Sequence, residues 1–84
     1  MEDQHHRAEW HIVVNGREKH IDHQRLTFDE VVALAPNLPP PGPTVEYKVV
    51  FEHAEEPKSG TLIQGESVLV KNGTEFVVTA TNRS

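Results

Sequence analysis

Apolar and polar side chains alternate in five segments of the chain, which is the pattern of half-buried β-strands. The segments are residues 10–14, 17–23, 45–54, 61–70 and 75–81. Asn15-Gly16, between the first two, is a strong signal for a two-residue hairpin because both positions tolerate a positive φ. Gly65 divides the fourth segment into two short extended pieces and indicates a bend or bulge. The pattern therefore predicts a sheet that begins with a β-hairpin.

One segment, within residues 24–38, has the period of a helix instead. Thr27 is a favourable N-cap, Glu30 completes a capping box, and Pro36 ends the helix after about two turns. The prolines between residues 39 and 43 favour a stiff polyproline II connector, and the alternative is a ligand for SH3-type domains. The apolar stripe of the helix consists of Phe28, Val31, Val32 and Ala35.

Strands before and after a single amphipathic helix predict a two-layer α+β domain. A mixed sheet of about four to five strands on one short helix is the β-grasp arrangement, with expected strand order 2-1-5-3-4. We expect a mobile leader at residues 1–8, the domain at residues 9–81 and an exposed tail at residues 82–84. The predicted core consists of Ile12, Val14, Ile21, Leu26, Val31, Leu34, Tyr47, Val49, Leu62, Val68, Val70, Phe76 and Val78.

The composition narrows the classes of function. The 84 residues include 8 Lys and Arg against 13 Asp and Glu, which leaves a formal net charge of −5 at pH 7. This acidity argues against a phosphate-binding surface, so no nucleic-acid partner is expected. No apolar run reaches the ~18 residues of a membrane span, and the polar start is unlike a secretory signal. Because cysteine is absent, disulfides and thiolate chemistry are excluded, and we expect a cytoplasmic location.

Six histidines raise the question of a metal site. His20 and His23 are three residues apart on a predicted strand, which puts their imidazoles on opposite faces. Without cysteine or an HExxH-like spacing, we expect no metal site and no cofactor, and we interpret the histidines as solvated surface groups. We do not expect an enzyme either, because Asp29 and Glu30 serve the helix start and Ser67 lacks the glycine pattern of a nucleophile elbow.

Four stretches, at residues 12–16, 26–35, 47–51 and 62–84, resemble the bacterial multi-ubiquitin domain, a family of ubiquitin-like β-grasp domains that often occur in tandem. The most specific is the pattern G-x-S-V-x-V-K-x-G-x-x-F-x-V-T-x-T at residues 65–81. The resemblance implies a protein modifier of a bacterial ubiquitin-like conjugation system, with phage defence as its proposed setting. The implied partners are an E1-like adenylating enzyme, an E2-like protein and a processing or deconjugating peptidase.

The C-terminal tail bears on which chemistry the resemblance supports. Ubiquitin-like modifiers and sulfur carriers usually end in Gly-Gly, whereas this chain ends in Thr81, Asn82, Arg83 and Ser84. The resemblance implies that an E1-like enzyme acts on the carboxylate of Ser84, and the alternative is that this copy is not activated. We expect the preceding residues to form a threading tail that leaves the sheet. A sulfur carrier is the less favoured alternative, because it needs a terminal thiocarboxylate that is normally carried on Gly-Gly.

A β-grasp helix covers only one face of its sheet, so residues on the other face are candidates for partner binding. With the expected strand order, Val13, Val50 and Val77 meet near the centre of that face, ringed by polar groups. Apolar patches with polar rims often mark interaction sites. A non-covalent module that self-associates through a sheet edge is the alternative to a modifier. The predicted partner-binding residues are His11, Val13, Lys48, Val50, Val77 and Thr79.

Overall fold

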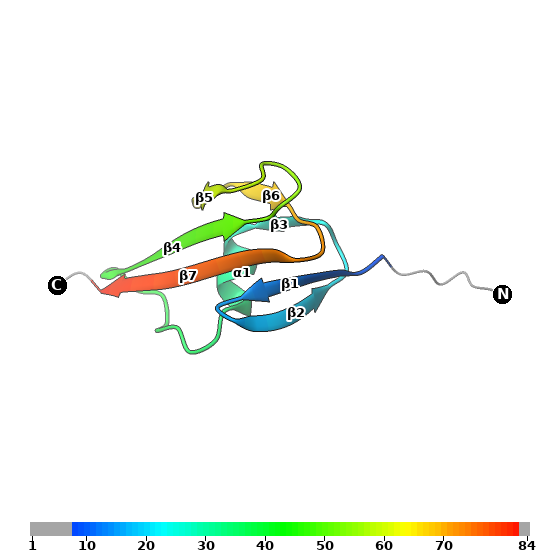
Figure 1. Ribbon diagram of the computed structural model, residues 1–84. Coiled ribbons are helices and arrows are strands. Elements are labelled where there is room, and N and C mark those ends of the chain that lie inside the picture. The colour runs from blue at the N-terminus through cyan, green and yellow to red at the C-terminus, as the bar shows by residue number, and fades with distance from the viewer. Residues whose placement is uncertain (1–7, 83–84) are drawn as a thin grey trace.

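The computed structural model describes residues 8–82, in which seven strands and one helix follow each other along the chain (Figure 1). The predicted leader lies outside the described residues except for Ala8, which is exposed. The elements are β1 (Trp10–Val14), β2 (Arg17–Ile21), β3 (Arg25–Thr27), α1 (Phe28–Leu34), β4 (Val45–Glu52), β5 (Gly60–Leu62), β6 (Ser67–Leu69) and β7 (Thr74–Asn82).

Five of these strands form a mixed sheet in the order β2-β1-β7-β4-β5. β1 and β7 are parallel, and the other neighbours are antiparallel. β3 and β6 form a separate two-stranded sheet, which the sequence pattern did not predict. The observed order carries different strand numbers from the expected 2-1-5-3-4, because the described chain has seven strands where five were predicted. The neighbours expected for the first, third and last predicted strands are nevertheless the observed ones, so the α+β ubiquitin-like arrangement is confirmed.

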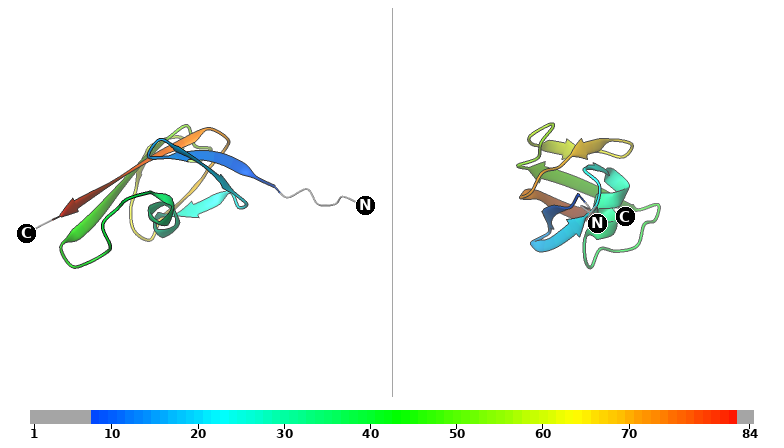
Figure 2. Two further views of the ribbon diagram at one scale, coloured as in Figure 1. Left: turned by 90° about the horizontal axis from the view of Figure 1, so that it is seen from below. Right: turned by 90° about the vertical axis from the view of Figure 1, so that its right-hand side faces the viewer.

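Helix α1 covers one face of the five-stranded sheet and leaves the other face open (Figure 2). The core lies between the two layers, and every predicted core residue is buried except Leu34 and Tyr47, which are half-buried at its margin. Tyr47 stays partly exposed because its hydroxyl donates a hydrogen bond of 2.6 Å to the carbonyl of Pro39, in the proline-rich connector. The structure adds Phe28, Phe51, Ala54 and Thr74 to the buried set.

The start of α1 is fixed by the predicted capping box. The Thr27 hydroxyl accepts a hydrogen bond of 3.2 Å from the backbone N–H of Glu30. The Glu30 carboxylate in turn accepts one of 2.9 Å from the backbone N–H of Thr27. These bonds satisfy two backbone donors that the helix start would otherwise leave unpaired. The helix therefore begins at Phe28, as predicted.

The turn between β1 and β2 is a type I′ turn, because Asn15 and Gly16 have φ values of 51° and 81°. The Asn15 side-chain amide also bonds to β7: its Nδ2 donates to the Val78 carbonyl at 3.0 Å, and its Oδ1 accepts from the Val78 N–H at 2.7 Å. The side-chain amide of Asn15 thus continues the hydrogen bonding between β1 and β7 by one residue beyond the end of β1. The turn thereby fixes the first hairpin against the last strand.

The C-terminal strand extends further than predicted. Thr81 pairs with Glu46 and Asn82 pairs with Val45, so both residues belong to β7. The prediction that the tail leaves the sheet at Thr81 is wrong, because β4 is long enough to pair with β7 up to Asn82. Both side chains are exposed, as predicted. Arg83 and Ser84, the rest of the predicted tail, lie outside the described residues.

Candidate functional site

We call the face of the five-stranded sheet that is turned away from α1 the outer face. Its residues alternate along each strand with the buried core residues Ile12, Val49, Phe51, Phe76 and Val78. Figure 1 shows the molecule from this side, with α1 behind the strands. All six predicted partner-binding residues occupy this alternating set: His11, Val13, Lys48, Val50, Val77 and Thr79.

The register of the strands decides which of the predicted residues are neighbours. Val50 lies directly opposite Val77 across β4 and β7, and Lys48 lies opposite Thr79. These four side chains form the continuous part of the predicted patch. Val77 is 54% exposed, which is unusual for a large apolar side chain in the middle of a sheet. The Val50–Val77 pair is therefore the apolar centre of the outer face.

Val13 does not lie directly beside the Val50–Val77 pair. Its partner in the parallel pairing of β1 with β7 is Glu75, not Val77. Val13 is therefore a diagonal neighbour of Val77 rather than its direct partner. The position of Val13 is set by the parallel pairing of β1 with β7.

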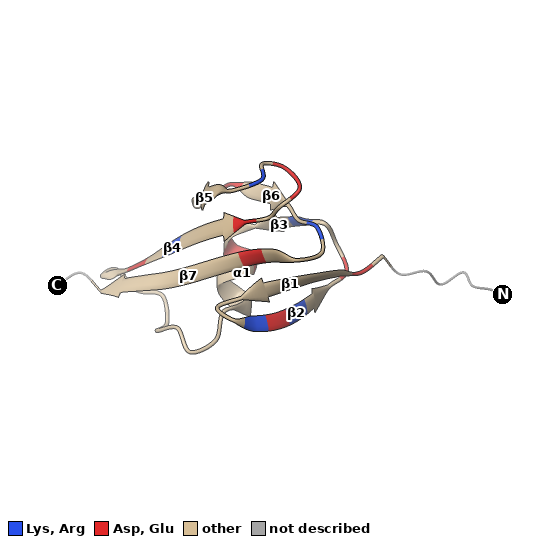
Figure 3. Ribbon diagram, viewed as in Figure 1, with Lys and Arg blue, Asp and Glu red and all other residues tan. Residues whose placement is uncertain are grey.

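Carboxylates, which sequence reasoning did not select, occupy the row beside the valine pair. Glu75 lies opposite Glu52 on one side and Val13 on the other, and Glu18 lies opposite Val13 on β2. Figure 3 shows these acidic positions on β2, β7 and the end of β4. Like charges placed directly opposite each other destabilise a sheet. The alternation of side chains along β4 was enough to predict that Glu52 faces outward. That Glu75 lies opposite it depends on the register between β4 and β7.

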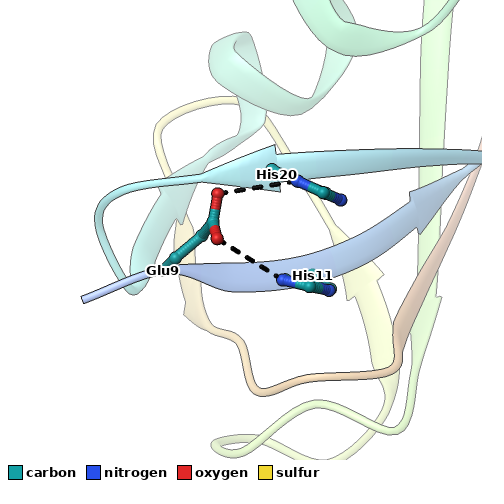
Figure 4. A group of neighbouring side chains, drawn as sticks. All are labelled: Glu9, His11 and His20. Carbon is teal, nitrogen blue, oxygen red and sulfur yellow. Dashed lines mark ion pairs between the residues drawn. The ribbon is translucent and has the colours of Figure 1, made fainter. Parts of the chain in front are cut away.

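Two histidines meet at the other end of this face. His11 lies opposite His20 across β1 and β2, and their rings stack with centroids 4.2 Å apart at an interplanar angle of 11°. Glu9 and Glu18 flank the stacked rings (Figure 4 shows Glu9). The sequence analysis did not identify this pair, although the turn at Asn15-Gly16 fixes the hairpin register that brings the two histidines together.

His23 lies apart from this pair, between Asp22 and Glu30. One imidazole nitrogen lies 2.9 Å from the Asp22 carboxylate, and the other lies 2.9 Å from the Glu30 carboxylate.

Comparison with known proteins identifies the family. The family model for multiubiquitin matches residues 10–82. The chain belongs to the multiubiquitin family. No curated protein and no solved structure matches this multiubiquitin domain. The domain is therefore a ubiquitin-like module, in agreement with the sheet that grips a single helix.

Among residues 8–82 of this multiubiquitin domain, no helix is long and apolar enough to cross a membrane. The outer face carries an apolar pair, a row of carboxylates and a stacked histidine pair. Such a surface is suited to contact with another protein: valines lose water on association, and carboxylates select a partner with basic groups.

Proposed function

We propose that this multiubiquitin domain is a protein modifier that partners recognise through the outer face of its sheet. The observation that carries the proposal is the exposed Val77 beside the half-buried Val50 on a ubiquitin-like domain. An apolar patch with a polar and charged rim is typical of a surface that another protein contacts. The modifier role itself rests on the family and on the resemblance described above.

The charges beside the valine pair define the chemistry of the docking partner. Glu52 and Glu75 lie next to the valines, whereas the cation on this part of the face is Lys48. A partner that presents an apolar side chain flanked by Arg or Lys would bury the valines and compensate both carboxylates. We therefore propose that the E1-like and E2-like proteins dock with a basic, partly apolar surface.

Activation would take place at the C-terminal carboxylate of Ser84. The described end of β7 lies at the opposite end of the molecule from the start of β1 (Figure 1). β7 stays paired with β4 as far as Asn82. To act on Ser84, the adenylating enzyme would approach the chain at this end of the paired strands.

Self-association through a sheet edge is the rival function. The edge strand β2 carries Arg17, Glu18, Lys19 and His20 in succession. Charged side chains on an edge strand discourage pairing with another sheet. The other edge strand, β5, has three residues and offers a short template. These features favour the modifier over a self-assembling scaffold.

The experiment measures ATP-dependent pyrophosphate release by the E1-like enzyme of the same system, followed by intact mass of the products. We expect activity with the wild type, a strong loss with Val77→Asp because a charge is placed in the docking contact, and none after deletion of Arg83 and Ser84. Ile63→Asp is the matched control, since Ile63 is 55% exposed but lies beyond β5, outside the paired strands.

Each outcome of this experiment decides between the candidate functions. A covalent adduct with other proteins supports the modifier, and a gain of one sulfur atom supports the sulfur carrier. Full activity of the truncated chain would rule out Ser84 as the activated end. Absence of any reaction, together with concentration-dependent oligomers, would favour the scaffold.

A further inference from the structure

We propose that Glu9, His11 and His20 form a surface site for Zn²⁺ or a similar divalent transition-metal ion. Two imidazoles and a carboxylate are ligands that zinc accepts, and each offers one donor atom here, all within 4.8 Å of one another. The inference is independent of the modifier function, because it depends only on the first hairpin. It replaces the expectation from the sequence that the histidines are isolated surface groups.

The distances between donor atoms are close to those of a tetrahedral zinc site. The Glu9 carboxylate oxygens lie 3.6 Å from Nε2 of His11 and 3.5 Å from Nδ1 of His20 (Figure 4). In a tetrahedral site with Zn–N of about 2.0–2.1 Å, the donor atoms are about 3.3 Å apart. Because the two rings are stacked at an interplanar angle of 11°, their lone pairs run nearly parallel. Binding of one ion would therefore require these exposed side chains to rotate until both lone pairs point at it.

Glu18 completes the arrangement from the opposite side of the rings. Its Oε2 lies 3.7 Å from Nδ1 of His11 and 3.6 Å from Nε2 of His20, which are the ring nitrogens that do not face Glu9. In protein metal sites, a ligating histidine almost always donates its other ring N–H to an acceptor such as a carboxylate. Both distances exceed hydrogen-bond length, so Glu18 would move closer to accept an N–H and orient the rings when the ion binds.

The backbone that carries these ligands is held in place by the rest of the fold. The N–H of His11 donates to Oδ1 of Asn72 at 2.8 Å, and its carbonyl accepts from the N–H of Gly73 at 2.8 Å. Both backbone groups of His11 thus point away from β2, which makes His11–His20 a non-hydrogen-bonded pair. Side chains are closest in such pairs, so the fold brings the two imidazoles together before any ion binds.

The ligand set also selects the metal. Imidazole suits Zn²⁺, Cu²⁺ and Ni²⁺, whereas Mg²⁺ and Ca²⁺ prefer oxygen ligands alone. Three protein ligands leave a fourth position for water or for a group from another protein. The side chains of His11 and His20 are 48% and 50% exposed, so an ion can reach the site without opening the fold.

The test is a calorimetric titration of the full chain with Zn²⁺, repeated with Co²⁺, whose visible absorption reports the coordination geometry. Because His5 and His6 could bind zinc themselves, the titration uses the chain with both replaced by Ala. We expect one ion per chain, a cobalt spectrum of a four-coordinate site and a melting temperature that rises with Zn²⁺ concentration. Mg²⁺ should give no binding heat.

Variants show where the ion binds. His11→Ala and His20→Ala should each lower zinc affinity at least about tenfold, and Glu18→Gln about tenfold through the lost orientation of the rings. His53→Ala is the matched control, because His53 is an exposed histidine that also lies beside a carboxylate, with 3.8 Å from its Nε2 to Glu52. Equal affinity of the wild type and His11→Ala, or no saturable binding without His5 and His6, would overturn the proposal.

Discussion

Asn15 connects the first hairpin to the last strand through three hydrogen bonds. Its backbone N–H donates to the Phe76 carbonyl at 2.9 Å, and its side-chain amide bonds to both backbone groups of Val78. The residue also has a φ of 51°, which asparagine tolerates better than most residues. Asn15 therefore serves the turn and the parallel pairing of β1 with β7 at once.

We expect Asn15→Ala to lower the free energy of unfolding by roughly 2 kcal/mol, because it loses both side-chain bonds and strains the positive φ. Asn15→Gly separates the two effects, since it loses the same bonds but relieves the strain. Urea denaturation of the three proteins measures the difference. Equal stability of the wild type and Asn15→Gly would contradict the role of the amide.

At the scale of elements, the start of α1 depends on local hydrogen bonds. Replacing Thr27 with Ala removes the acceptor for the Glu30 N–H, and we expect a loss of about 1 kcal/mol. Thr27→Ser is the control, because it keeps the hydroxyl. Thermal denaturation should show a lower melting temperature for Thr27→Ala alone, and an unchanged value would contradict the capping box.

The same helix start carries a pH-sensitive contact. Hydrogen bonding to Asp22 is the main cause that raises the pKa of His23 above its ordinary 6.5, and the bond from the Thr27 N–H is the main cause that lowers the pKa of Glu30 below 4.5. A protonated imidazole can donate to both carboxylates at once, whereas a neutral one can donate to only one of them.

The contribution of His23 to stability is therefore fully present below pH 6.5 and is lost as the pH rises through the raised pKa of the folded state. The contribution of Glu30 is present above pH 4.5 and is lost as the pH falls through its lowered pKa. We expect the difference in stability between the wild type and His23→Gln to be larger at about pH 5.5 than at about pH 8.5. Because His23 is exposed, the effect should be small and should weaken with salt. A stability difference between the wild type and His23→Gln that is equal at both pH values would contradict this role of His23.

The elements that local signals specify could be predicted from the sequence. Thr27 with Glu30 gave the helix start, and Asn15-Gly16 gave the turn. The extended piece after Gly65 is β6, but β3 and its pairing with β6 could not be predicted, because β3 has three residues and the pairing joins distant segments. The placement of Val13 opposite Glu75 was missed for a related reason: a parallel pair has no connecting turn to set its register.

At the scale of the whole molecule, the outer face combines features that stability alone would not favour. The exposed Val77 and the facing pair Glu52–Glu75 lie side by side on β4 and β7. Val77 leaves about half of its surface in water, and facing carboxylates cost free energy. Features that lower stability without an evident structural gain are expected at functional surfaces. The same argument supports the placement of partner binding on this face.

This argument predicts opposite effects of one substitution on folding and on docking. Glu75→Gln removes the repulsion with Glu52, so we expect the free energy of unfolding to rise by about 0.2–1 kcal/mol at low salt and the gain to shrink at high salt. The same change removes a carboxylate from the proposed docking surface, so binding to the basic E1-like partner should weaken. Urea denaturation and a binding titration measure the two effects. Glu55→Gln makes the same change in net charge in a loop between β4 and β5 and should alter neither. A Glu75→Gln protein that is less stable than the wild type would show that the carboxylate serves the fold rather than a partner.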